Sequence, residues 1–100
     1  MPGASLPASR PAQYADAADT LAAVRRVLTD TLLLGERGRA LRPESGLLGH
    51  LPELDSMAVM SLVTALEQRF DIVIEDEDIR AQTFDTLAGL AGFIESKRAQ

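Results

Sequence analysis

Residues 55–72 of this 100-residue chain read DSMAVMSLVTALEQRFDI and carry its clearest structural signal. Four apolar side chains recur there at intervals of three and four residues, the spacing of one helix face: Val59, Val63, Leu66 and Phe70. Asp55 precedes this pattern, and its carboxylate can accept a hydrogen bond from a free N–H group of the first helical turn. We therefore predict a helix that begins after Asp55 and ends near residues 70–71.

The sequence after this helix predicts a connector, a short turn and a last helix. Residues 72–74 are all β-branched, but no partner strand is found elsewhere, so we expect an extended connector. Residues 75–79 can form one short helical turn led by acids. The last helix is predicted to have Thr83 or Asp85 as its cap and basic residues in its final turn. Its apolar face consists of Leu87, Leu90, Ala91 and Ile94.

The sequence before residue 55 predicts one more helix and a long loop. The helix should run from about residue 16 to about residue 34, with Gly35 as its stop. Glycines and prolines then punctuate roughly twenty residues, which is long for a connection in a small domain. Either the leucines within this loop pin it to the core, or the loop carries function, or both. Those leucines are Leu47, Leu48 and Leu51.

Together these elements predict an all-α fold with no sheet. Each helix has a single apolar face, so the helices must pack together as a small four-helix bundle, three main helices and a short third one. A long loop joins the first two. Residues 1–13 hold three of the five prolines and no apolar period, so we expect a disordered N-terminal tail there. The folded helical domain is expected to span residues 14–98.

Composition excludes several classes of function. The chain has no cysteine and one histidine, His50, which excludes thiolate nucleophiles and His- or Cys-rich metal sites. A net charge of −5 is the wrong sign for binding nucleic acid. The longest apolar run is four residues, too short for a membrane span or a secretory signal, so we expect a cytoplasmic protein. We also expect it to be a monomer.

The charge is concentrated in the middle of the chain. Residues 44–80 contain nine acidic and two basic residues, a net charge of −7, whereas residues 1–43 have a net charge of +2. One interpretation is a solvated surface that keeps the protein soluble, and the other is a docking surface for basic partners. The acidic run at residues 75–78 resembles a calcium loop only in composition, because the glycine and the distant glutamate of that loop are missing. We expect no metal site.

Ser56 is the residue where chemistry is best placed. The pattern puts its hydroxyl in the first turn of a helix, where unpaired N–H groups and the positive end of the helix dipole favour a phosphate. Taken alone, Asp55-Ser56 is only a helix cap. A catalytic pair of Ser56 with His50 would make a small hydrolase, but a loop containing Pro52 separates the two, so we expect no catalytic residue.

The pattern D-S-x-x-x-x-x-L-V-x-A-L-E-x-x-F-x-I at residues 55–72 resembles the acyl carrier protein family. Residues 74–79 and 83–87 look like the third helix of that family and the start of its fourth. The resemblance implies that Ser56, flanked by Asp55 and Met57, is esterified with 4′-phosphopantetheine from coenzyme A. A phosphopantetheinyl transferase performs that step, and the thiol of the arm then carries acyl or aminoacyl groups as thioesters. The chain would then be a carrier and not an enzyme.

The same resemblance implies an interaction surface and a set of partners. The partners would be the transferase, an acyl- or aminoacyl-loading ligase and acyl-transfer enzymes. Fatty-acid carriers usually place acids soon after the serine, where this chain has Ala58 and Ser61. The segment LPELDSMAV at residues 51–59 looks most like carriers of bacterial exosortase and exopolysaccharide systems, which occur with an AMP-forming acyl ligase. The expected docking residues are Glu53, Met60, Glu67, Asp71, Glu75 and Asp76.

We therefore expect a dedicated acyl carrier that is loaded by an AMP-forming ligase. A peptidyl carrier loaded with an amino acid, and a carrier of general fatty-acid synthesis, are the alternatives within the family. Outside the family, the alternative is a helical adaptor that binds proteins through its acidic residues and never carries an arm.

Overall fold

The computed structural model describes the backbone of residues 12–99 and the side chains of residues 19–99. No strand occurs between residues 12 and 99, where the only β-type pairing is an isolated bridge between Gly46 and Thr86. The predicted all-α fold is confirmed. The elements in chain order are α1 (Ala12–Leu32), α2 (Glu36–Arg39), α3 (Ser56–Phe70), the 3₁₀ turn η2 (Asp76–Asp78) and α4 (Leu87–Arg98).

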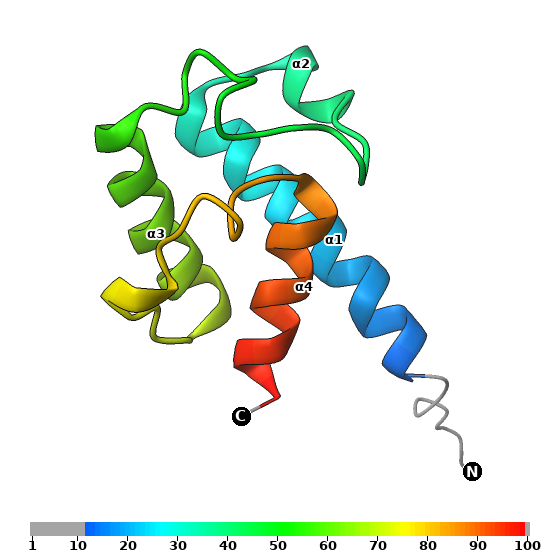
Figure 1. Ribbon diagram of the computed structural model, residues 1–100. Helices are drawn as coiled ribbons and strands as arrows, with labels where there is room; N and C mark the ends of the chain where they lie inside the picture. The colour runs from blue at the N-terminus through cyan, green and yellow to red at the C-terminus, as the bar shows by residue number, and fades with distance from the viewer. Residues whose placement is uncertain (1–11, 100) are drawn as a thin grey trace, which may run out of the picture.

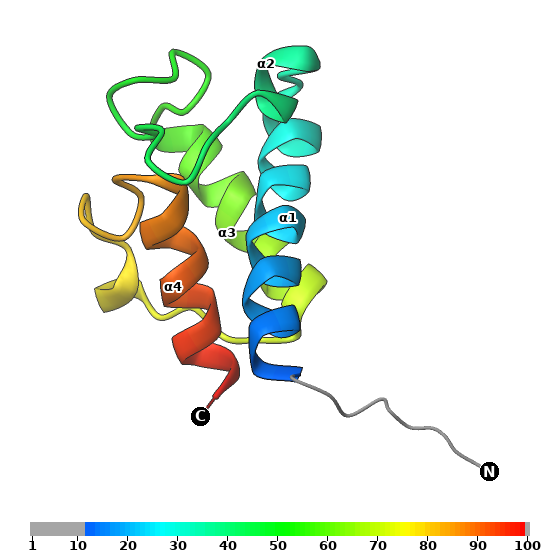
Figure 2. The ribbon, with the colours of Figure 1, turned by 90° about the vertical axis from the view of Figure 1, so that its right-hand side faces the viewer.

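Three helices build the bundle, and α1 is its centre. The helix α1 runs antiparallel to α3 and α4 and packs against both (Figure 1). The turned view shows the same arrangement, with the long loop and α2 at the end where α3 and α4 begin (Figure 2). The apolar faces predicted from the sequence meet in one core. Its fully buried members include Val24, Leu28, Leu62, Leu66, Leu87, Leu90 and Ile94.

The boundaries of α1 differ from the prediction at both ends. The helix begins at Ala12, so residues 12 and 13 of the expected tail are helical, while residues 1–11 lie outside the described part of the chain. It ends at Leu32 because Leu33 adopts a left-handed conformation with φ 55°. The N–H of Leu34 then donates to the carbonyl of Thr29 at 2.9 Å, which closes the helix. Gly35 is therefore not the stop.

The helix α2 was not predicted from the sequence. It has only four residues, which is too short for an apolar period to appear. Gly35, with φ 62°, leads into it, and the buried Gly38 lets it approach α1 closely. A Cβ atom at Gly38 would lie 2.1 Å from Thr29 Oγ1, so only glycine fits there.

The long loop is fixed to the start of α4, as one of the two expectations proposed. Leu47 is fully buried, and Leu48 and Leu51 are partly buried against the core. The N–H groups of Leu47 and Leu48 donate to the carbonyls of Asp85 and Phe84 at 2.8 and 2.9 Å. In return, loop carbonyls accept hydrogen bonds from two N–H groups in the first turn of α4. The loop thus supplies partners that the end of a helix lacks.

These loop contacts explain why the predicted cap of α4 was wrong. Thr86, and neither Thr83 nor Asp85, is the N-cap, and its hydroxyl accepts a hydrogen bond from the N–H of Gly89 at 3.0 Å. The Thr83 hydroxyl donates instead to the carbonyl of Asp78 at 2.7 Å. The Asp85 carbonyl pairs with the loop, so residues 83–85 form a turn before the helix. Between residues 12 and 99, no helix is both long and apolar enough to span a membrane.

Candidate functional site

Ser56 is the first residue of α3, at the end of the bundle where the long loop runs. The predicted cap is confirmed, because Asp55 Oδ1 accepts a hydrogen bond from the N–H of Ala58 at 2.8 Å. The Ser56 side chain is exposed, and within the described residues its hydroxyl makes no hydrogen bond. Ser56 therefore presents a free hydroxyl beside the positive end of a fifteen-residue helix.

An apolar groove of about 340 Å³ opens directly beside Ser56. Its walls come from the loop, from the first turn of α3 and from the segment between η2 and α4. Most of its lining is hydrocarbon, and its two charged residues are Asp55 and Arg80. A groove of this composition suits a flexible apolar chain. The lining residues are Leu48, Leu54, Asp55, Ser56, Val59, Met60, Ile79, Arg80, Ala81 and Phe84.

Two methionines make the surface around Ser56 apolar. Met57 is 80% exposed and Met60 is 54% exposed, although both belong to a helix whose other large apolar residues are mostly buried. Methionine is flexible and polarizable, so it adapts to differently shaped protein surfaces. The predicted flanking residue Met57 and the predicted docking residue Met60 are thus both exposed near Ser56.

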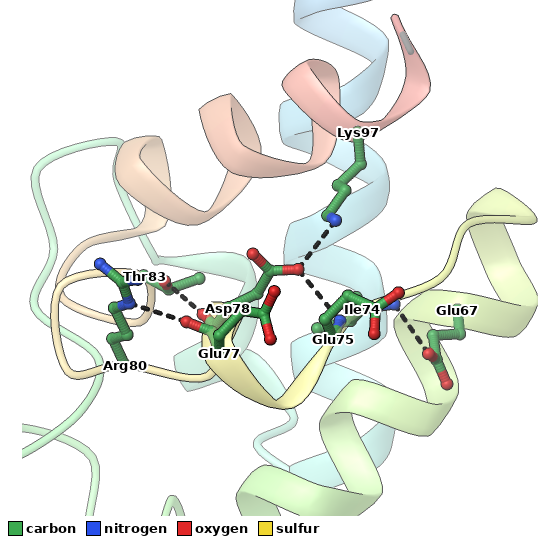
Figure 3. Close-up of polar contacts among 8 residues, drawn as sticks. All are labelled: Glu67, Ile74, Glu75, Glu77, Asp78, Arg80, Thr83 and Lys97. Atoms are coloured by element: carbon green, nitrogen blue, oxygen red, sulfur yellow. Dashed lines mark hydrogen bonds and ion pairs between the residues drawn. The ribbon is translucent and has the colours of Figure 1, made fainter.

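Two of the predicted docking acids are engaged within the protein itself. Glu53 forms a two-pronged ion pair with Arg37 of α2, which lowers the pKa of Glu53 and raises the pKa of Arg37. Glu67 is half-buried, and its Oε2 accepts a hydrogen bond from the N–H of Ile74 at 2.8 Å (Figure 3). The Glu67 carboxylate thus holds the connector that follows α3.

The other three predicted acids are exposed, and none of them lines the groove beside Ser56. Asp71 is the exposed C-cap of α3, in a left-handed conformation with φ 56°, so about 22 Å of helix separates it from Ser56. Glu75 and Asp76 are exposed at the start of η2, where Glu75 and Asp78 form a capping box. The structure therefore does not gather the six predicted docking residues at Ser56; of these, only Met60 lines the groove.

Arg80 is the site residue that the sequence analysis missed. It lines the groove together with Ser56, yet it follows a run of four acids and looks like part of a charged surface. A signal was present, since Arg80 is one of only two basic residues between residues 44 and 80. Sequence spacing could not reveal that the turn after η2 folds back beside the first turn of α3.

The structure gives no support to a catalytic pair or a metal centre. His50 is exposed in the loop, its ring lies against Gly46, and no hydrogen bond joins it to Ser56. Among the described side chains, no group of three or more histidine, cysteine, aspartate or glutamate residues could hold a metal ion.

Comparison with known proteins identifies the family. A family model described as a phosphopantetheine attachment site matches residues 43–94, which include Ser56 and every residue named above as lining the groove. An acyl carrier protein of Helicobacter hepaticus is 32% identical over 80 residues, which are 80% of this chain and 99% of that protein. This chain belongs to the acyl carrier protein family.

Two further relatives agree with that assignment. An acyl carrier protein of an Exiguobacterium species is 46% identical over 43 residues, 43% of this chain, and the match spans about half (52%) of that relative. The solution NMR structure of a holo acyl carrier protein from Nitrosomonas europaea superposes with a TM-score of 0.76 and 54% sequence identity. That superposition covers 80% of this chain and 96% of the other.

The acyl carrier protein described here is a carrier with covalently attached 4′-phosphopantetheine as its cofactor. Its own residues fit that group, because the exposed Ser56 hydroxyl is free and the neighbouring groove is apolar. When attached, the arm supplies a thiol that forms thioesters, which this cysteine-free chain cannot supply from its side chains.

Proposed function

We propose that Ser56 is the attachment residue and that this acyl carrier protein presents acyl thioesters to partner enzymes. In the attachment step, the Ser56 oxygen forms a new bond to the phosphorus next to the pantetheine of coenzyme A. The pyrophosphate bond breaks, the serine proton is lost, and adenosine 3′,5′-bisphosphate leaves. The chain's contribution is to expose the hydroxyl at the end of a rigid helix; a phosphopantetheinyl transferase supplies the catalysis.

The observation that carries this proposal is the exposed position of Ser56 at the start of α3, beside an apolar groove. The carboxylate of Asp55 stabilises the first turn of α3 through its hydrogen bond with the N–H of Ala58, so the Ser56 hydroxyl has a defined position on the protein surface. The groove of about 340 Å³ gives an attached acyl chain an apolar surface on which to lie.

We further propose that this is a dedicated bacterial carrier in the cytoplasm, loaded by an AMP-forming acyl ligase and related to exosortase and exopolysaccharide systems. The apolar surface of Met57 and Met60 beside Ser56 supports a partner that reads hydrophobic contacts. The exposed acids Asp71, Glu75 and Asp76 would add electrostatic steering toward a basic partner. Because Glu53 and Glu67 are engaged internally, we assign them a supporting role in docking.

The test is the intact mass of the purified chain after incubation with coenzyme A, magnesium and a broad-specificity transferase. Wild type should gain one phosphopantetheine unit, and Ser56→Ala should gain none while its free energy of unfolding changes by no more than about 1 kcal/mol. Ser61→Ala, an exposed serine in the next turn of α3, is the matched control and should be modified like wild type. Modification of Ser56→Ala would disprove the assignment.

The loading step can be tested separately on the modified protein. An AMP-forming ligase with ATP and a fatty acid should add one acyl group to the thiol, and the mass gain identifies that acid. Loading with amino acids alone would instead support the peptidyl carrier. Failure of every acid with a correctly modified protein would contradict the ligase proposal and leave the Ser56 assignment intact.

A further inference from the structure

Among the described residues, Arg80 is the only positively charged one that lines the groove beside Ser56. It reaches this position from the turn after η2, opposite the first turn of α3. Figure 3 shows Arg80 and Lys97 on opposite sides of the acidic segment that contains Glu77 and Asp78. Arg80 and Lys97 therefore have different surroundings, and Arg80 is the one that lines the Ser56 groove.

Arg80 is held in place but keeps most of its hydrogen-bonding capacity. Its Nε donates to the carbonyl of Glu77 at 2.7 Å, which fixes the plane of the guanidinium group. None of the ion pairs found in the described part of the chain includes Arg80, although four acids stand at residues 75–78. Asp78 is paired with Lys97 at 2.8 Å instead. The two terminal nitrogens of Arg80 remain available for an anion.

The attachment at Ser56 creates an anion in this same groove. A phosphodiester carries one negative charge, and on Ser56 it would be next to the Asp55 carboxylate. Asp55 Oδ1 already accepts a hydrogen bond from the N–H of Ala58. Like charges on neighbouring residues repel, and a cation in the same groove would offset this repulsion. Arg37 pairs with Glu53 and does not line the groove, whereas Arg80 lines it and is in no ion pair with a described residue.

We propose that Arg80 binds the phosphodiester of the arm on Ser56 and holds the start of the arm along the apolar groove. Guanidinium and phosphate groups match in a two-pronged geometry, and such charge-assisted bonds are stronger than neutral ones. Arg80 is thus a positioning residue for the arm. This proposal rests on the attachment at Ser56 proposed above.

The experiment uses the full chain with its arm and follows the single phosphorus of the arm by ³¹P NMR. Arg80→Gln should change the ³¹P chemical shift relative to wild type, and Arg80→Lys should restore part of that shift. Arg69→Gln is the matched control, because Arg69 is an exposed arginine of α3 outside this groove, and it should behave like wild type. About 1 M salt should move the wild-type signal toward that of Arg80→Gln, because screening then acts within about 3 Å.

A second readout needs no substitution. The Nε–H resonance of Arg80 in wild type should shift when the unmodified chain is converted to the modified one. Equal ³¹P shifts in wild type and Arg80→Gln, with no movement of this resonance, would overturn the proposal.

Two further results separate the possible failures. The Arg80 Nε–H resonance could instead shift only after the arm is loaded with a succinyl group, and not with an uncharged butyryl group. That result would show that Arg80 binds the carboxylate of the acyl group, and it would also overturn the proposal. Absence of any arm on wild type by intact mass would instead reject the Ser56 attachment itself.

Discussion

The Lys97 ammonium nitrogen lies 2.8 Å from Asp78 Oδ2 and ties the last turn of α4 to η2 (Figure 3). The same Asp78 oxygen accepts the N–H of Glu75 at 3.0 Å, so one carboxylate caps the start of η2 and also joins this turn to α4. The hydrogen bond from Lys97 lowers the pKa of Asp78, and Asp78 in turn raises the pKa of Lys97. The segment that forms one wall of the Ser56 groove begins directly after Asp78, so this ion pair anchors its start.

This ion pair predicts how stability depends on pH. Asp78 has a lower pKa in the folded than in the unfolded chain, so its contribution is present above the usual aspartate value of about 3.9 and is lost as the pH falls through the folded pKa. Lys97 has the opposite shift, so its contribution is lost as the pH rises through a value above about 10.4. Asp78→Asn should therefore destabilise the chain at neutral pH, with a difference from wild type that shrinks toward both extremes.

The measurement is the urea midpoint of wild type and Asp78→Asn from acid to alkaline pH. Asp76→Asn is the control, because Asp76 is exposed on the same turn and makes no ion pair with a described residue. A difference between wild type and Asp78→Asn that stays constant at every pH would contradict the prediction.

Removal of the Asp55 carboxylate should cost the helix its cap and leave the serine in place. Asp55→Ala leaves the N–H of Ala58 without its 2.8 Å partner, so we expect a loss of about 1 kcal/mol in the free energy of unfolding. Asp55→Asn keeps an acceptor oxygen and should lose less. Urea unfolding of the three proteins checks this, and an Asn variant as unstable as the Ala variant would show that charge matters more than the cap.

Leu66 tests the helix register that the sequence predicted. Its side chain is fully buried at the centre of α3, so Leu66→Ala should lower the free energy of unfolding by about 2–5 kcal/mol. Gln68→Ala, two residues on and exposed, should change it by no more than about 0.5 kcal/mol. Chemical denaturation followed by circular dichroism measures both, and similar curves for the two variants would refute this register.

Glu67 should matter for stability through its oxygen and not through its charge. Glu67→Ala removes the acceptor for the half-buried N–H of Ile74, with an expected loss of about 1–3 kcal/mol. Glu67→Gln retains an oxygen at the same reach and should lose much less. If the Gln variant unfolds as easily as the Ala variant, the hydrogen bond to Ile74 does not account for the role of Glu67.

Much of the fold followed from local patterns that depend on few residues. The helix α3 and its Asp55 cap could be predicted from the sequence, because a helix face and a cap each depend on a few neighbouring residues. The position of Ser56 could be predicted for the same reason, since Asp55-Ser56 lies at the start of the apolar pattern of α3. The C-terminal end of α1 and the N-cap of α4 could not be predicted in this way. Residues near Leu33 and Thr86 have an equal or better local preference for the capping position.

The sequence by itself determined the helical class, the three apolar faces and the serine at the start of α3, because these depend on short-range spacing. Only the tertiary structure decided which loop carbonyls complete α4, which acids are engaged internally, and that Arg80 shares a groove with Ser56. Those relationships join residues far apart in the chain, and packing of the buried core together with the loop hydrogen bonds brings them together. The physical reason is that hydrophobic burial is non-directional. The sequence pattern therefore predicts which residues are buried, but only the packed structure shows which residues they contact.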